Sequence, residues 1–192
     1  FLGILIFLPF LLANSNAQES EPIPITLSHT MDKIKFDGRW SFETEWKAST
    51  LSEFFYNDTE VILRSAHQGE FIYILVDPVT ERSLDYMLDT AMVCFNSKYD
   101  NSEKHDDYCF IAVLGESGGT TLQRSDLKFE QIPNHEQFIA VGNSSDNNDR
   151  YTAIPHPSYE FKIPIELLGR YDKYGFFFSA YDANKTKFYN WP

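Results

Sequence analysis

Positive charge is scarce in this sequence, and its scarcity excludes one class of partner. Of the 192 residues, 16 are Lys or Arg and 28 are Asp or Glu, which gives a formal net charge of −12 at pH 7. Such a chain repels a phosphate backbone, and it has no Lys or Arg cluster that could displace the counterions of a nucleic acid. We therefore expect no nucleic-acid partner.

Catalytic motifs are also missing. The sequence has no nucleophile elbow, phosphate-binding loop or dinucleotide fingerprint. The five histidines, at positions 29, 67, 105, 135 and 156, have no paired spacing, which argues against zinc. No two of the 28 acidic residues stand out as the carboxylate pair of a glycoside hydrolase. We expect a non-catalytic protein, either independent or an accessory module of an enzyme that acts on glycosides.

Long hydrophobic runs are absent beyond the first residues. Residues 1–13 carry no charge but fall short of the ~20 apolar residues of a transmembrane helix. Ser15 and Ala17 then occupy the −3 and −1 positions of a secretory cleavage site, so residues 1–17 are interpreted as a signal peptide that lacks its basic start. An uncleaved anchor is the alternative. We expect a secreted or extracytoplasmic protein, or one at the cell surface, with membrane contact only through an uncleaved or missing anchor.

The remaining chain divides into a leader and one folded body. Residues 18–32 are rich in proline and acid, and we expect an extended leader that adds an edge strand at Ile23 to Leu27. Residues 33–192 form the expected binding domain. Export also makes the glycosylation sequons at Asn57, Asn143 and Asn184 relevant, and their presence predicts that these residues lie on surface loops.

Short apolar runs alternate with turn clusters along the body, which indicates an all-β protein. The expected strands are Ile34 to Phe36, Val61 to Arg64, Phe71 to Val76, Ala91 to Phe95, Tyr108 to Leu114, Phe138 to Val141, Tyr159 to Ile163, Phe176 to Tyr181 and Lys187 to Trp191. One short helix is expected at Pro164 to Leu168, because proline is tolerated at a helix start and Gly169 suits a left-handed cap. The pattern predicts an antiparallel β-sandwich with one short helix.

The two cysteines lie on neighbouring expected strands. If Cys94 faces Cys109 in a hairpin, the same register pairs Phe95 with Tyr108 and Val93 with Phe110, so that aromatic side chains meet across the ladder. An oxidising compartment favours a cross-strand disulfide in this geometry. The alternative is two buried free thiols.

The order of several landmarks resembles the family 9 carbohydrate-binding modules and their relatives. The similar segments are Lys35 to Trp40 with Glu45-Trp46, Phe71 to Asp77, Asp89 to Asn96, Tyr159 to Pro164, Leu167 to Gly169, Tyr181-Asp182 and Trp191-Pro192. This resemblance implies a jelly-roll-like sandwich, supported by calcium, that grips sugars between aromatic side chains. The wider superfamily includes haem-binding domains. Asn96 departs from the pattern, which often has Asp there.

Carbohydrate binding needs an exposed aromatic ring and planar polar side chains for the sugar hydroxyls. The candidates for stacking are Trp191, Trp40 and Tyr189, and the polar candidates are Arg64, Glu70 and Asn190. Trp191 has a second interpretation, as the closing plug of the sandwich, and the indoles of Trp40 and Trp46 in the opening segment have one as structural packing groups. The expected partner is thus an oligo- or polysaccharide.

Two further ligands stay open. The oxygen-rich loop with Asp100, Glu103, Asp106 and Asp107 suits Ca²⁺, or is only a solvated acidic hairpin tip. The segment 146–149 is expected to be a turn. Haem is the alternative ligand, for a b-type domain of an extracytoplasmic electron-transfer protein. Its axial candidates are Met87, Met92 and His105, although Met92 also fits a core position.

Overall fold

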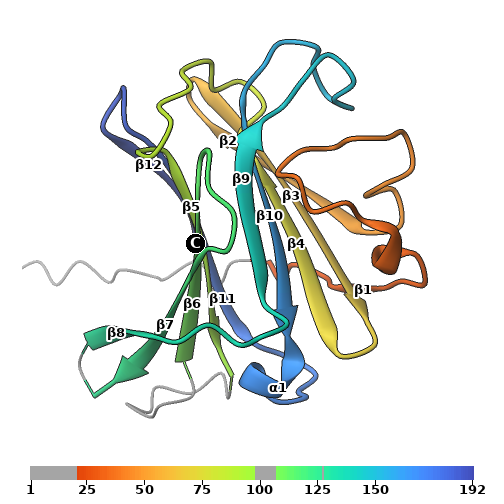
Figure 1. Ribbon diagram of the computed structural model, residues 1–192, viewed down its shortest axis with the longest axis vertical. Coiled ribbons are helices and arrows are strands. Elements are labelled where there is room, and N and C mark those ends of the chain that lie inside the picture. The colour runs from red at the N-terminus through yellow and green to blue at the C-terminus, as the bar shows by residue number, and fades with distance from the viewer. Residues whose placement is uncertain (1–20, 98–106, 127) are drawn as a thin grey trace, which may run out of the picture.

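Two facing β-sheets make up the protein (Figure 1). The computed structural model describes residues 21–97, 107–126 and 128–192. The strands are β1 (Thr26–Leu27), β2 (Thr50–Tyr56), β3 (Thr59–Gln68), β4 (Phe71–Asp77), β5 (Thr90–Asn96), β6 (Asp107–Val113), β7 (Thr120–Ser125), β8 (Lys128–Ile132), β9 (Ile139–Ser144), β10 (Pro157–Pro164), β11 (Gly175–Asp182) and β12 (Lys187–Trp191). A 3₁₀ turn, η1 (Met31–Lys33), and one helix, α1 (Ile165–Leu168), complete the described elements. In this part of the chain, no helix is long and apolar enough to cross a membrane.

The strand order confirms the expected β-sandwich. The first sheet runs β1-β3-β4-β10-β9, with β2 also paired to β3, and the second runs β12-β11-β5-β6-β7-β8. Pairing is antiparallel throughout the described strands except where the short β1 lies parallel to β3. Between the sheets, alternate residues of β4, β5, β10 and β11 meet in one apolar core. This is the layer that two half-apolar sheets must form to remove those faces from water.

A second apolar layer covers the outer face of the first sheet. Met31, Trp40 and Trp46 pack there on Tyr73 and Leu75 of β4. We call residues 28–49 the cover; it is drawn in red and orange beside β1 and β3 in Figure 1. Because of the cover, β4 is buried on both faces, which explains its nearly unbroken apolar sequence.

The cysteine hairpin has the predicted register. Cys94 pairs with Cys109, Phe95 with Tyr108 and Val93 with Phe110, and the two cysteines form a disulfide. The predicted helix is also confirmed: Pro164 precedes α1, and Gly169 follows it with a left-handed φ of 76°. The residues of the β5–β6 pair that face the core are Ala91, Val93, Phe95, Phe110 and Ala112, and the disulfide lies on the opposite, outer face of the second sheet.

Several strand expectations need correction. Residues 34–36 follow η1 as irregular chain and not as a strand, because they belong to the cover, which has no strand partner. The expected edge strand at Ile23 to Leu27 is reduced to β1. Strands β2, β7 and β8 were not expected; their exposed or half-buried side chains give weak apolar periodicity. The leader also joins the fold, since Met31 is fully buried.

The surface-loop prediction is wrong for one of the three sequons. Asn57 and Asn184 are exposed in the turns that follow β2 and β11. Asn143 instead lies within β9, and its side-chain amide donates a hydrogen bond to the backbone oxygen of Asp37 at 3.0 Å. This amide therefore already holds the cover against the first sheet.

Candidate functional site

The cover is fixed to the first sheet by one buried carboxylate. Glu160 on β10 accepts hydrogen bonds from the backbone N–H groups of Asp37 and Gly38, at 3.0 and 2.7 Å, and from the indole N–H of Trp46 at 3.0 Å. Burial raises the pKa of Glu160 to about 8, although the donors Trp46 and Gly38 partly oppose the rise. Nearby Glu45 adds to the rise by repulsion.

The segment 35–46, which carries the resemblance at the start of the body, has mainly this scaffolding role. Glu45 is buried and accepts hydrogen bonds from the backbone N–H groups of Lys35 and Ser41, at 2.8 and 2.6 Å. Gly38 has a φ of +78°, and a Cβ atom there would lie 2.6 Å from the backbone nitrogen of Asn143. The glycine and the glutamate thus give this irregular segment one conformation.

Trp40 of the cover lies at the centre of a cluster of planar groups that it forms with Tyr151 and Arg64. Its indole is 1% exposed, with the ring of Tyr151 perpendicular to it at 5.9 Å and the guanidinium of Arg64 at 5.4 Å. Arg64 also donates hydrogen bonds to the hydroxyl of Tyr151 and the backbone oxygen of Ser49, at 2.8 and 3.2 Å. The cation is therefore bound by π faces and oxygens although it is buried.

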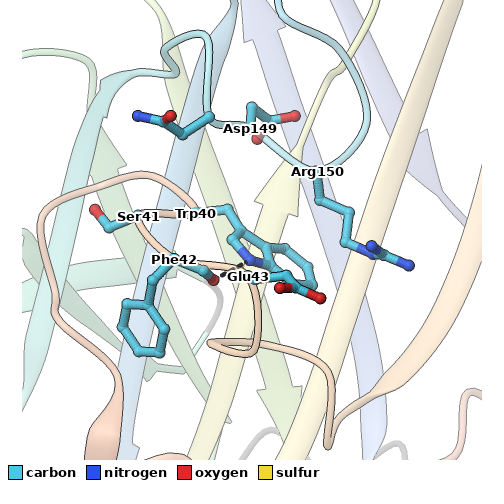
Figure 2. A pocket seen from close by; sticks show the side chains of 7 residues that line it. Trp40, Ser41, Phe42, Glu43, Asp149 and Arg150 are labelled. Carbon is cyan, nitrogen blue, oxygen red and sulfur yellow. Dashed lines mark hydrogen bonds between the residues drawn. The ribbon is translucent and has the colours of Figure 1, made fainter.

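A polar pocket of about 410 Å³ opens beside this cluster (Figure 2). Its lining residues come from two segments, the cover and the loop between β9 and β10, and are Trp40, Ser41, Phe42, Glu43, Asn148, Asp149 and Arg150. Phe42 is 39% exposed, and the exposed Arg150 places its guanidinium 6.0 Å from the ring of Trp40. The lining therefore combines hydroxyl, carboxylate, amide and guanidinium groups with one accessible aromatic ring, and Figure 2 shows the Phe42 ring directed away from Arg150.

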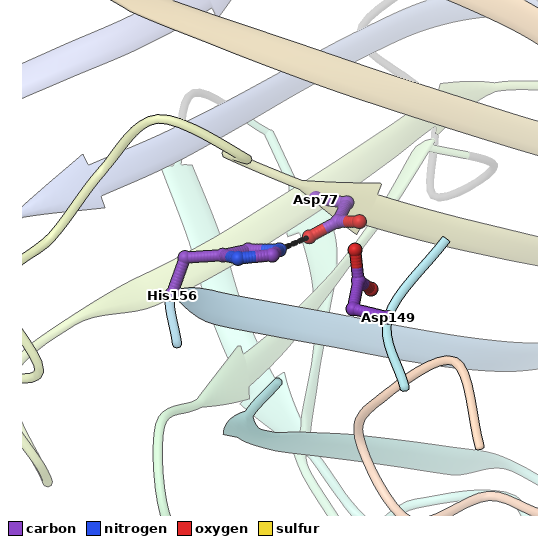
Figure 3. A group of neighbouring side chains, drawn as sticks. All are labelled: Asp77, Asp149 and His156. Carbon is purple, nitrogen blue, oxygen red and sulfur yellow. Dashed lines mark hydrogen bonds and ion pairs between the residues drawn. The ribbon is translucent and has the colours of Figure 1, made fainter. Parts of the chain in front are cut away.

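A buried ionisable pair, Asp77 and His156, lies beside Asp149, which lines the pocket (Figure 3). The Nε2 atom of His156 lies 2.8 Å from Oδ1 of Asp77, and both side chains are fully buried. Burial alone lowers the pKa of His156, but the hydrogen bond and charge of Asp77 outweigh it and raise the pKa above its usual value. Asp149, which also lines the pocket, lies beside this pair. One possible metal-ligand atom from each of the three side chains lies within 4.8 Å of the other two.

The same histidine contacts a serine, which gives the group the composition of a catalytic triad. Nδ1 of His156 lies 2.8 Å from Oγ of Ser145 and 2.9 Å from the backbone oxygen of Ile154. Ser145 and His156 are buried, and neither lines the pocket above. A substrate carbonyl therefore has no path to the serine oxygen in this conformation, and the group is best explained as a support for the β9–β10 loop.

A second hollow, of about 310 Å³, lies at the other end of the cover. Phe36, Phe71 and Tyr73 supply its aromatic lining, and Glu70 and Lys162 are among its charged residues. The ammonium of Lys162 sits 3.9 Å from the ring centre of Phe71, so one face of that ring is already occupied. Glu70 forms an ion pair with Arg170.

Of the six predicted sugar-binding residues, only Trp40 and Arg64 lie together at the pocket described above, and Glu70 lines the second hollow. Trp191, Tyr189 and Asn190 lie together on β12 in the other sheet. Trp191 packs on Phe54 and Phe176 as part of the core, and Tyr189 is buried beside Tyr56. The indole of Trp40 and the ring of Tyr189 thus offer no exposed face.

The predicted metal and haem residues have the following positions. Asp100, Glu103, Asp106 and His105 lie outside the described residues; Asp107 is buried at the start of β6 and forms an ion pair with Arg124 at 3.1 Å. Met87 is exposed, and Met92 lies half-buried on β5. Neither methionine lines either pocket. The segment 146–149 forms the expected turn, in which Asn148 N–H donates to the Asp146 carboxylate.

Comparisons with known proteins give no relative. A scan against protein-family models, a search of curated proteins and a search of solved structures each returned no match. The chemistry of the pocket must therefore be argued from the residues themselves.

Of the residues that line the pocket, sequence reasoning predicted only Trp40 as a sugar-binding residue. Phe42, Glu43, Asn148 and Arg150 lie in irregular segments about a hundred residues apart, and no periodicity marks such positions. A usable signal was present in the polar cluster 146–150, since a loop of that length between two strands is a common place for binding residues.

Proposed function

We propose that the protein binds carbohydrate in the pocket above Trp40 and has no catalytic activity of its own. The observation that supports this is one cavity lined by an accessible ring, Phe42, together with Glu43, Asn148 and Arg150. A pyranose has an apolar face that covers an aromatic ring and hydroxyls that exchange hydrogen bonds with planar polar groups.

The buried cluster around Trp40 supports the same function. Trp40, Tyr151 and Arg64 hold the pocket floor rigid, so a ligand is bound without the entropic cost of ordering that floor. Sugars are neutral and well hydrated, and they need such a preformed set of donors and acceptors. The resemblance to family 9 carbohydrate-binding modules implies the same ligand class.

A glycan array tests the proposal. We expect the wild-type protein to bind, and we expect Phe42→Ala to weaken binding about tenfold, because stacking on one ring contributes about 1.4 kcal/mol. Arg150→Ala should also weaken binding, through lost hydrogen bonds. The matched control is Phe129→Ala on β8, an equally exposed phenylalanine (44%) in the other sheet.

Two results would contradict the proposal. If the wild-type protein binds no glycan, the ligand class is wrong, and a Soret band from protein produced with haem would favour the haem alternative. If Phe42→Ala and Phe129→Ala bind as the wild type does, the sugar binds elsewhere.

A further inference from the structure

A group of carboxylates lies outside the pocket, where the loop after β4 meets the end of β11. Oxygens of Asp85, Asp89 and Asp182 lie within 4.8 Å of one another. Asp89 immediately precedes β5, and Asp182 is the last residue of β11. Three like charges are therefore brought together by the fold from segments almost a hundred residues apart.

The backbone fixes this group but does not neutralise it. The Asp89 carboxylate accepts hydrogen bonds from the N–H groups of Asp85 and Ala183, at 2.8 and 2.9 Å. Asp182 accepts one from the N–H of Lys185 at 2.9 Å. The ammonium of Lys185 lies 3.4 Å from Asp182 and is shared with Asp58. One shared ammonium does not balance three carboxylates at such short range.

A fourth, deeply buried acid gives an independent indication of a ligand. Glu81 is 2% exposed, and its Oε2 atom has no hydrogen-bond partner. Burial raises its pKa, and repulsion by the nearby Asp182 and Asp89 raises it further. The Oδ2 atom of Asp85 is likewise buried without a partner. Buried carboxylate oxygens with no donor are costly unless a cation satisfies them.

We propose that Asp85, Asp89 and Asp182, with Glu81 beside them, bind a Ca²⁺ ion that ties the loop after β4 to the end of β11. The donors are all hard oxygens, which Ca²⁺ prefers, and oxygens on opposite sides of a bound Ca²⁺ are about 4.6 to 5.2 Å apart. The measured spacing of the three carboxylates agrees with that span. This proposal does not depend on what the pocket above Trp40 binds.

The other cluster of possible ligands, two carboxylates and a histidine, is a weaker candidate for a metal. In the cluster of Asp77, Asp149 and His156, the histidine already lies 2.8 Å from Asp77, and its other nitrogen faces the backbone oxygen of Ile154. Both nitrogens face acceptors, so a proton supplies the positive charge that a metal would bring. Asp149 is therefore a suitable control residue.

Calcium binding is measured on the chelator-treated protein by calorimetry and by Tb³⁺ luminescence excited through tyrosine. Tyr189 makes the second readout direct, because its hydroxyl lies 3.4 Å from Oδ2 of Asp182. We expect one tight site, a rise in the unfolding temperature with Ca²⁺, and a smaller rise with Mg²⁺, which keeps its own water shell.

Substitutions distinguish this site from the other candidate metal sites. Asp85→Asn should weaken Ca²⁺ binding about tenfold or more, since affinity follows the number of charged ligands. Asp85 is half-buried and so tolerates substitution best, and Glu81→Gln is the second test should Asp85→Asn misfold. Asp149→Asn and the double variant Asp100→Asn/Asp106→Asn should bind as the wild type does. Three results would each overturn the proposal. These are no calcium binding by the wild type, wild-type affinity in both Asp85→Asn and Glu81→Gln, and a loss of calcium binding only in Asp100→Asn/Asp106→Asn.

Discussion

Gly38 shows how a single missing side chain shapes the cover. The backbone there has a left-handed conformation and touches Asn143 of β9, so this position needs both a residue without a Cβ atom and a close approach. Gly69 has a similar positive φ of 59° but nothing within 4 Å of its would-be Cβ. The two glycines therefore separate the cost of backbone strain from the cost of a clash.

We expect Gly38→Ala to lower the free energy of unfolding by about 3 kcal/mol or more, and Gly69→Ala by about 1 kcal/mol. Only the first variant adds a steric clash to the left-handed strain. Urea unfolding of both variants at one pH provides the measurement. Equal losses in the two variants would mean that the cover adjusts freely at Asn143.

At the scale of elements, the disulfide closes the hairpin of β5 and β6. It joins residues 15 apart in sequence, and a loop of that size restricts the unfolded chain by about 3 kcal/mol in the chain-entropy model. We expect the double variant Cys94→Ala/Cys109→Ala to be less stable by about that amount, as measured by urea unfolding. The wild type under reducing conditions is the matched comparison, and a fully reduced protein with unchanged stability would contradict the prediction.

The same hairpin shows which elements a sequence can predict. Its register follows from alternating apolar residues and a cysteine pair, which are local and regular. The helix at α1 was likewise marked by Pro164 and Gly169. The cover could not be predicted this way, because Trp40 and Trp46 are held by Glu160 and by the outer face of β4, and no period relates those positions. The pocket above Trp40 is built partly from the cover, so most of its lining residues were missed with it.

At the scale of the whole molecule, buried ionisable groups act on stability in one direction. The raised pKa of Glu160, about 8, means that the native state keeps a proton that the unfolded chain releases above pH 4.5, so stability falls as pH rises between these values. The raised pKa of His156 acts alike: its contribution is present below pH 6.5 and is lost as pH rises through the native pKa. Asp58 and Glu43, whose pKa values are lowered by lysines, act the other way but are exposed and screened.

We therefore expect the free energy of unfolding to be larger at pH 5.5 than at pH 8.5. Urea unfolding across that range measures it, with calcium removed so that cation binding does not contribute. Glu160→Gln should reduce the slope, because it removes the titration of this carboxyl group. A stability that rises steadily with pH would contradict this assignment of protons.

The long sequence separation between the cover and its anchor has a consequence for biosynthesis. Asp37 and Gly38 bind a carboxylate that lies more than 120 residues later in the chain. During synthesis the cover therefore emerges long before β10 exists, and until then Asp37, Gly38 and Trp46 lack the carboxylate of Glu160 that fixes them. The cover is therefore without its anchor until β10 has been made, and we expect a chaperone that shields aromatic segments to act during that interval.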